Sequence, residues 1–76
     1  MPAKYPILKP KELIRVLEEY GYKFVSQKGS HMKYSNGERK VIIPNHYEIA
    51  KGTLKSILTQ ADIDIDEFLN VLSKIR

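Results

Sequence analysis

The 76-residue sequence contains no cysteine, and this absence removes several classes of site at once. Without cysteine, the chain has neither a disulfide framework nor a thiolate metal site, which fits a reducing compartment and predicts a cytoplasmic protein. It also has no apolar run approaching the ~20 residues that a membrane-spanning helix needs. Residues 1–10 lack the continuous hydrophobic segment of a signal peptide. We therefore expect no membrane association.

Histidine is scarce, because only His31 and His46 are present. Two histidines this far apart, with no cysteine, do not match common zinc-ligand spacing. The chain also lacks a glycine-rich nucleotide loop and a Gly-x-Ser-x-Gly nucleophile motif. We expect no metal and no small-molecule cofactor.

The aspartates at 62, 64 and 66 begin like a calcium-binding loop. Such a loop requires glycine at its sixth position and glutamate at its twelfth, where this chain has Glu67 and Ser73. Helix capping is the better interpretation of these aspartates.

The length of the chain limits it to one compact domain, residues 1–76, with residues 1–9 predicted as an extended N-terminal arm. Domains of this size bury only about 60% of the surface of the unfolded chain, so nearly every apolar side chain must join one core. A shallow groove or a binding surface is therefore more plausible than a deep pocket.

Positive charge is concentrated in the body of the domain. Residues 1–61 hold eleven Lys and Arg against five Asp and Glu, whereas residues 62–76 hold two against four. A basic body suits a polyanionic partner, because neutralised phosphates release counterions. A net charge of +4 is also common in soluble small domains, so charge alone does not decide the function.

Hydrophobic periodicity predicts a helix between Pro10 and Gly21, with proline at its start and glycine just past its end. From Tyr22 the period changes to two. This predicts a strand with Tyr22, Phe24 and Ser26 on one side and Lys23, Val25 and Gln27 on the other, ended by a turn at Gly29.

The dipeptide Asn36-Gly37 predicts a two-residue hairpin between strands Ser30–Ser35 and Glu38–Ile43, with Pro44 ending the second strand. This loop would place Lys33 opposite Lys40 and His31 opposite Ile42. One face would then carry Met32, Tyr34, Val41 and Ile43, and the other His31, Lys33, Lys40 and Ile42.

After a loop at 45–52, the pattern predicts a helix from about Thr53 to Ala61 and a last helix capped by Asp64. The fold class is therefore α+β in the order α-β-β-β-α-α. A three-stranded antiparallel sheet with helices on one face leaves the other face open to solvent, and we expect function there or along its edge.

The stretch from Lys28 to Tyr34 places a histidine in a short basic strand. Histidine can both accept and donate a proton near pH 7, because its unperturbed pKa is about 6.5. Lys28, Lys33 and Lys40 would bind phosphate, and the backbone N–H groups of Gly29 and Ser30 would form a cradle for it. Beside them, His31 could cleave RNA, whose 2′-hydroxyl supplies the nucleophile. From this stretch taken alone, a solvated, non-catalytic histidine is the favoured interpretation.

His46 is the only possible second imidazole. It could serve as the complementary acid or base, but a structural hydrogen bond that anchors the loop is the favoured interpretation.

Four segments, taken together, resemble the HicA-type toxins: Glu18-Glu19-Tyr20-Gly21-Tyr22, Gln27 to Tyr34 with Gly29-Ser30-His31 at its centre, Ile43-Pro44-Asn45-His46, and Lys51 to Leu58. The resemblance covers residues 8–72. It implies a double-stranded-RNA-binding-like fold and a metal-independent endoribonuclease that cleaves mRNA, with His31 as the catalytic histidine. It also implies neutralisation by a HicB-like antitoxin. This chain departs from the family in having Asp62 where a glycine is usual, and in its longer N-terminal arm.

Two other functions stay open at this stage. One is a non-catalytic double-stranded-RNA-binding module, which would recognise A-form shape through phosphate and 2′-hydroxyl contacts. The other is an interaction subunit whose basic face meets an acidic protein.

Overall fold

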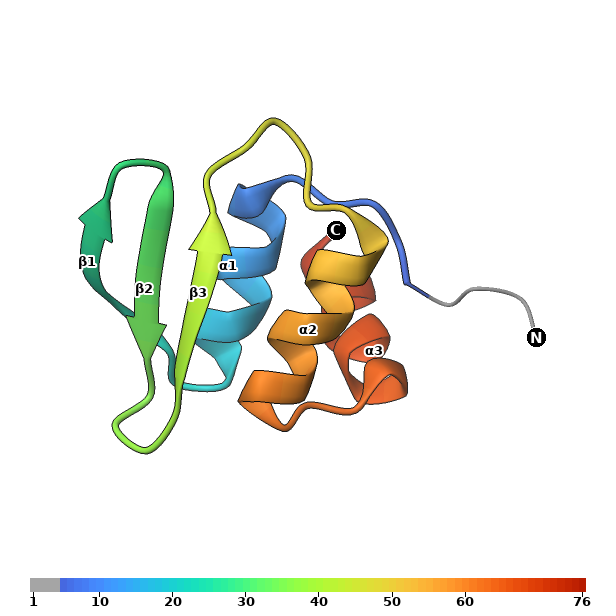
Figure 1. Ribbon diagram of the computed structural model, residues 1–76. Coiled ribbons are helices and arrows are strands. Elements are labelled where there is room, and N and C mark those ends of the chain that lie inside the picture. Colours follow the sequence, from blue (N-terminus) through green and yellow to red (C-terminus); the bar gives the residue numbers. More distant parts are fainter. Residues whose placement is uncertain (1–4) are drawn as a thin grey trace.

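The computed structural model, which describes residues 5–76, has the predicted order α-β-β-β-α-α (Figure 1). The elements are α1 (Pro10–Glu19), β1 (Lys23–Lys28), β2 (His31–Ser35), β3 (Lys40–Pro44), α2 (Lys51–Ala61) and α3 (Ile65–Ile75). The strands form one antiparallel sheet in the order β1-β2-β3. Of the predicted arm, residues 1–4 lie outside the described part of the chain.

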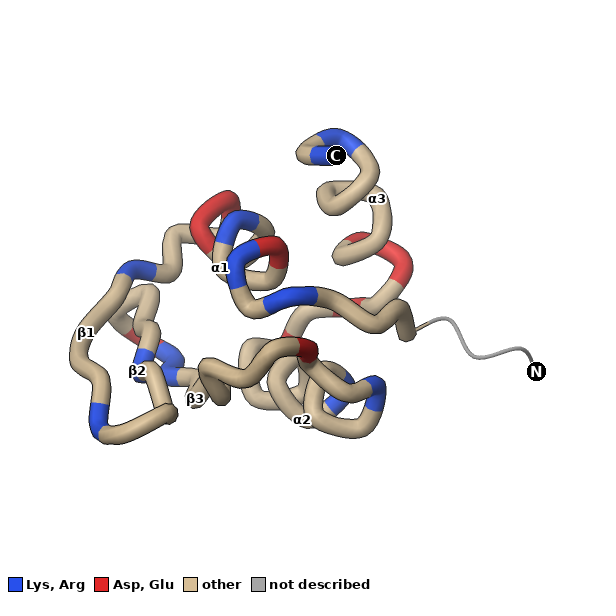
Figure 2. Tube along the Cα trace, turned by 90° about the horizontal axis from the view of Figure 1, so that it is seen from above, with Lys and Arg blue, Asp and Glu red and all other residues tan. Residues whose placement is uncertain are grey.

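The elements form two layers. Figure 2 shows the sheet and α2 along one side of the molecule, with α1 and α3 behind them. Helix α2 continues the front layer beside β3, and α1 packs against α3 in the rear layer. The face of the sheet that points away from α1, hereafter the open face, is therefore left to solvent.

The core lies between the two layers. The fully buried residues include Leu13, Val16 and Leu17 of α1, and they are joined from the sheet by Val41 and Ile43. Helices α2 and α3 contribute Leu54, Ile57, Leu58, Phe68 and Leu72. As predicted, Asp64 caps α3, because its carboxylate accepts a hydrogen bond from the backbone N–H of Asp66. Helix α2 begins at Lys51, two residues before the predicted start.

The predicted two-residue hairpin at Asn36-Gly37 is wrong. Ser35 pairs with Lys40, so the loop has four residues, 36–39, and the register shifts by two positions. The cause is the Asn36 side chain, whose Oδ1 accepts hydrogen bonds from the backbone N–H groups of Glu38 (2.9 Å) and Arg39 (2.7 Å). Because the shift is an even number of residues, the predicted faces of β2 and β3 remain correct.

The predicted regular alternation along β1 is also wrong. Phe24 pairs with Tyr34 and Ser26 pairs with Lys33, so Val25 is an extra residue in a β-bulge. The bulge inverts the alternation for the rest of the strand. Lys28, which regular alternation would put on the same face as Phe24, instead pairs with His31 at the open face.

All residues of β1 are exposed, which indicates that this strand extends beyond the helical layer. Its one ring contact is made by Phe24, which meets the Tyr34 ring edge-to-face at a centroid distance of 5.7 Å. The positions of His31 and its neighbours are thus set by β2 and β3, which are anchored in the core, while β1 supplies residues from the edge.

Candidate functional site

His31 is the first residue of β2 and is exposed at the open face. Its strand partners are Lys28 on β1 and Pro44 on β3. The ring makes no hydrogen bond to another of residues 5–76, so both of its nitrogens are available to a substrate. This arrangement brings together the imidazole and one of the predicted phosphate-binding lysines.

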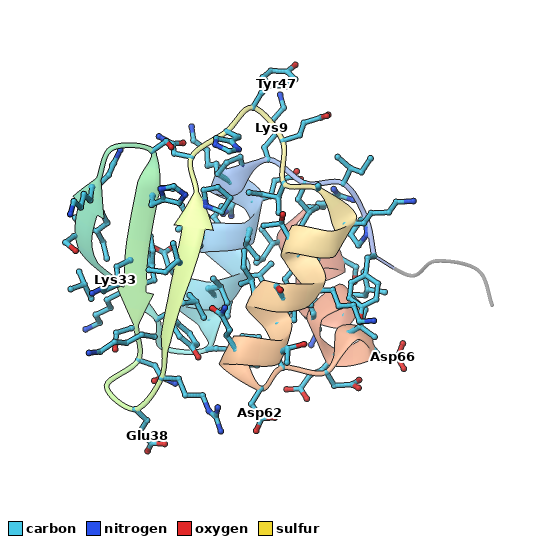
Figure 3. All side chains as sticks on the ribbon, viewed as in Figure 1. Lys9, Lys33, Glu38, Tyr47, Asp62 and Asp66 are labelled. Carbon is cyan, nitrogen blue, oxygen red and sulfur yellow. The ribbon has the colours of Figure 1, made fainter. Side chains whose placement is uncertain are left out.

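Lys33 lies two residues along β2 from His31 and therefore on the same face, and Figure 3 shows it on β2 toward the open face of the sheet. The register shift places Ile42, not Lys40, opposite Lys33. Lys40 faces Ser35 at the far end of β3, four residues from the partner of His31. At a rise of about 3.3 Å per residue, this separates Lys40 from His31 by about 13 Å along the strand. The structure therefore brings Lys28 and Lys33 close to His31, but not Lys40.

Gly29 and Ser30 form the two-residue turn between β1 and β2. Gly29 has a φ of 59°, a conformation that glycine adopts at little cost. Its carbonyl accepts a hydrogen bond from the Gln27 side chain at 2.9 Å, and the Ser30 carbonyl accepts one from the Asn45 N–H at 2.6 Å. Because the two carbonyls are engaged inside the protein, the turn is held in one orientation beside His31.

A groove of about 470 Å³ lies where the open face meets α2. The sheet side consists of His31, Ile42 and Pro44, and the connecting loop contributes His46. The far wall belongs to α2 and consists of Gly52, Thr53, Ser56, Ile57 and Gln60. The groove is shallow and open, as expected for a domain of this size. Both histidines of the chain therefore line one groove.

The polar residues on the α2 wall were missed by the sequence analysis. Thr53, Ser56 and Gln60 follow one another at spacings of three and four residues, so they share one face of the helix. The signal was present in the sequence, because this polar stripe lies opposite the buried stripe of Leu54, Leu58 and Ala61. Only the tertiary packing of α2 beside β3 shows that the stripe faces His31.

Within residues 5–76, the predicted side-chain hydrogen bond by which His46 would anchor its loop is not found. Its ring is exposed and makes no hydrogen bond within the described part of the chain. Backbone and neighbouring groups anchor the loop instead. Asn45 N–H bonds to the Ser30 carbonyl, and Ile49 N–H bonds to the Leu8 carbonyl, each at 2.6 Å.

A cation–π contact adds a further attachment on this loop. The Lys9 Nζ atom lies 5.4 Å from the centroid of the Tyr47 ring, and Figure 3 shows the two side chains together above the loop. Leu8, just before Lys9, is buried and pairs with Ile49 through an isolated β-bridge. The segment before α1 therefore braces the loop that carries His46.

The charge of the chain is divided between the layers. Residues 23–60, which form the sheet and α2, contain seven Lys and Arg but only Glu38 and Glu48 as acids. Figure 2 shows the basic residues of the sheet and α2 on one side of the molecule, and both acidic and basic residues on α1 and α3 behind. The groove therefore lies in the positive layer. Within residues 5–76, no group of three or more His, Cys, Asp or Glu is arranged to hold a metal ion.

A basic open face beside an exposed imidazole is compatible with a polyanionic, phosphate-bearing partner. In the comparison with known families, residues 10–63 match the model of the HicA toxin of bacterial toxin–antitoxin systems. Because this match covers well over half of the chain, the protein belongs to the HicA toxin family. No curated protein matches the chain significantly. None of the helices in residues 5–76 is long and apolar enough to cross a membrane.

Proposed function

We propose that this HicA-family toxin is a cytoplasmic, metal-independent endoribonuclease that cleaves mRNA, with His31 as the catalytic base. The observation that carries the proposal is the exposed His31 imidazole in a groove of the positive layer, with Lys28 as its strand partner. A HicB-like antitoxin would neutralise the toxin by covering the open face.

The reaction needs only groups that the chain and the RNA supply. Neutral His31 takes the proton of a ribose 2′-hydroxyl, and the oxygen attacks the adjacent phosphorus. The bond from phosphorus to the 5′-oxygen breaks, and that oxygen leaves with a proton. The products are a 2′,3′-cyclic phosphate and a 5′-hydroxyl end.

Lysines stabilise the charge that develops on the phosphoryl oxygens during this reaction. Lys28 and Lys33 share the open face with His31 and would contact the reacting phosphate. Gly29 and Ser30 would orient it through the turn. Lys40, at the far end of β3, would contact a phosphate further along the RNA.

Replacement of His31 by alanine tests the proposal directly. Because a positioned acid or base typically contributes ~10²–10⁴-fold, His31→Ala should lower the rate of RNA cleavage by about that factor. The ring is exposed, so the variant should keep its melting temperature and most of its affinity for RNA. The assay is gel analysis of labelled RNA in EDTA, with melting followed by circular dichroism.

Three results would contradict this function. Undiminished cleavage by His31→Ala would remove its catalytic role, and loss of wild-type cleavage in EDTA with recovery in magnesium would remove the metal-independent mechanism. Tight RNA binding with no cleavage by the wild type would favour the double-stranded-RNA-binding module. The cellular control is growth arrest on induction of wild type but not of His31→Ala, with rescue by the adjacent gene.

A further inference from the structure

The proposed reaction leaves one step without an assigned group, because the departing 5′-oxygen must gain a proton. His31, having acted as the base, would hold a proton from the 2′-hydroxyl on the wrong side of the phosphate to deliver it in the same step. A second group on the other side of the bound phosphate would let attack and departure proceed together.

The fold places His46 in the same groove as His31, on the loop that connects β3 to α2. The Asn45 N–H bond to the Ser30 carbonyl extends the β2–β3 pairing by one position beyond His31 and Pro44. His46 follows in the bend just after β3, two residues beyond the strand partner of His31. Both side chains line the same groove, so a phosphate bound there would have an imidazole from each.

Both histidine rings are accessible to a substrate bound in the groove. Both rings line it, both are exposed, and neither is hydrogen-bonded to another residue from 5 to 76. The loop that carries His46 is held by backbone hydrogen bonds to Ser30 and to Leu8. The backbone on either side of His46 is thus anchored, while its imidazole is left accessible to a substrate in the groove.

Resting on the function proposed above, we infer that His46 is a second catalytic residue, the general acid that protonates the departing 5′-oxygen. His31 removes the 2′-hydroxyl proton and ends protonated, while His46 gives up its proton and ends neutral. In each cleavage, His31 gains one proton and His46 loses one. Proton exchange with the solvent then returns both rings to their starting states.

A substrate with sulfur in place of the departing 5′-oxygen distinguishes a general acid from a residue that acts in another way. A thiolate is a much better leaving group than an alkoxide and departs without a proton donor. His46→Ala should cleave ordinary RNA about 100-fold more slowly than the wild type, within the usual range for loss of an acid or base. On the 5′-thio-substituted RNA, its rate should come within about tenfold of the wild type, and His31→Ala should stay impaired on both substrates.

Glu48→Gln is the matched control, because Glu48 is exposed on the same loop and does not line the groove. It should cleave both substrates at the wild-type rate. Each variant is checked for an unchanged melting temperature.

The outcomes separate this inference from the function on which it rests. If the wild type cleaves neither substrate, the proposed function fails. If the wild type cleaves and His31→Ala does not, two results overturn the inference alone: wild-type rates for His46→Ala, or an equal loss on both substrates. The second result would make His46 a positioning residue. Rescue of His31→Ala by the sulfur substrate would reverse the two roles and would also overturn the assignment.

Discussion

Asp62 adopts a backbone conformation that residues other than glycine rarely take. The residue follows the last residue of α2 with φ 57° and ψ 43°, which is the left-handed conformation that glycine favours at the end of a helix. The glycine that the family resemblance leads us to expect here would fit this geometry. Asp62 tolerates it, since aspartate is one of the few other residues that visit this region.

Asp62→Gly should therefore stabilise the domain. Removing the left-handed strain gains up to about 1 kcal/mol, since the left-handed conformation costs roughly 1–2 kcal/mol in other residues. The variant also loses an ion pair with Arg39 at 3.6 Å, which is largely exposed and contributes little. The free energy of unfolding in urea measures the net effect.

Asp62→Ala provides the comparison for this prediction, because it removes the same ion pair but keeps a Cβ atom in the left-handed conformation. It should be less stable than the wild type. Equal stabilities for the glycine and alanine variants would show that backbone strain at Asp62 is unimportant.

At the scale of elements, the faces of β2 and β3 were predictable, but the register and the bulge were not. Alternating apolar residues set the faces, and the burial of Met32, Tyr34, Val41 and Ile43 confirms them. The register depended on how Asn36 uses its side chain, and Asn-Gly is compatible with more than one loop length. Nothing in the alternation of β1 signals the extra residue at Val25, because both faces of this strand are exposed.

The bulge has a direct consequence for the site. It puts Lys28 opposite His31, whereas the sequence prediction had relied on Lys40 across from Lys33. The sequence therefore predicted correctly that lysines lie near His31, but it placed Lys40 wrongly. His46 could be named from the sequence as a second imidazole, but its presence in the same groove depends on the Asn45–Ser30 hydrogen bond.

Helices α1 and α3 are joined by a titratable contact. The Tyr20 hydroxyl, at the end of α1, donates a hydrogen bond to the Glu67 carboxylate of α3 at 3.2 Å. Burial first, and then this hydrogen bond and the nearby negative charges, raise the pKa of Tyr20 to about 12. The folded state thus favours neutral Tyr20 more strongly than the unfolded state, whose tyrosine has a pKa near 10.

Because the pKa of Tyr20 is higher in the folded state, its contribution to stability is complete below pH 10 and is lost as the pH rises toward 12. Tyr20→Phe should cost about 1 kcal/mol at pH 8, and this difference from the wild type should shrink between pH 10 and 12. Urea unfolding of both proteins across this range tests it. Tyr47→Phe, at an exposed loop tyrosine, controls for general alkaline effects, and a pH-independent difference for Tyr20→Phe would contradict the prediction.

For the whole molecule, the separation of charge between the layers predicts which lysines control RNA affinity. Lys28 and Lys33 lie on the open face, whereas Lys74 lies on α3 in the rear layer. A lysine that neutralises a phosphate releases counterions, so binding weakens with salt by a slope of about 0.7 per contact for single strands.

Lys28→Gln and Lys33→Gln should each reduce this salt slope by about 0.7, the value for one phosphate contact. The measurement uses the His31→Ala background so that the RNA stays intact. Lys74→Gln removes the same charge from the rear layer and should leave the slope unchanged. An equal reduction by all three variants would mean that net charge, and not the open face, controls binding. Affinity that barely changes with salt would favour an acidic protein as the partner.

The β-bridge between Leu8 and Ile49 has a consequence for how the chain folds during its synthesis. Leu8 is among the first described residues to leave the ribosome, Ile49 follows much later, and the core is complete only when Phe68 and Leu72 have joined it. Small domains fold as cooperative units, so a nascent chain carries His31 and His46 without the packing that brings them together. On the function proposed above, an unfinished chain would lack the assembled groove and would not cleave the message that encodes it.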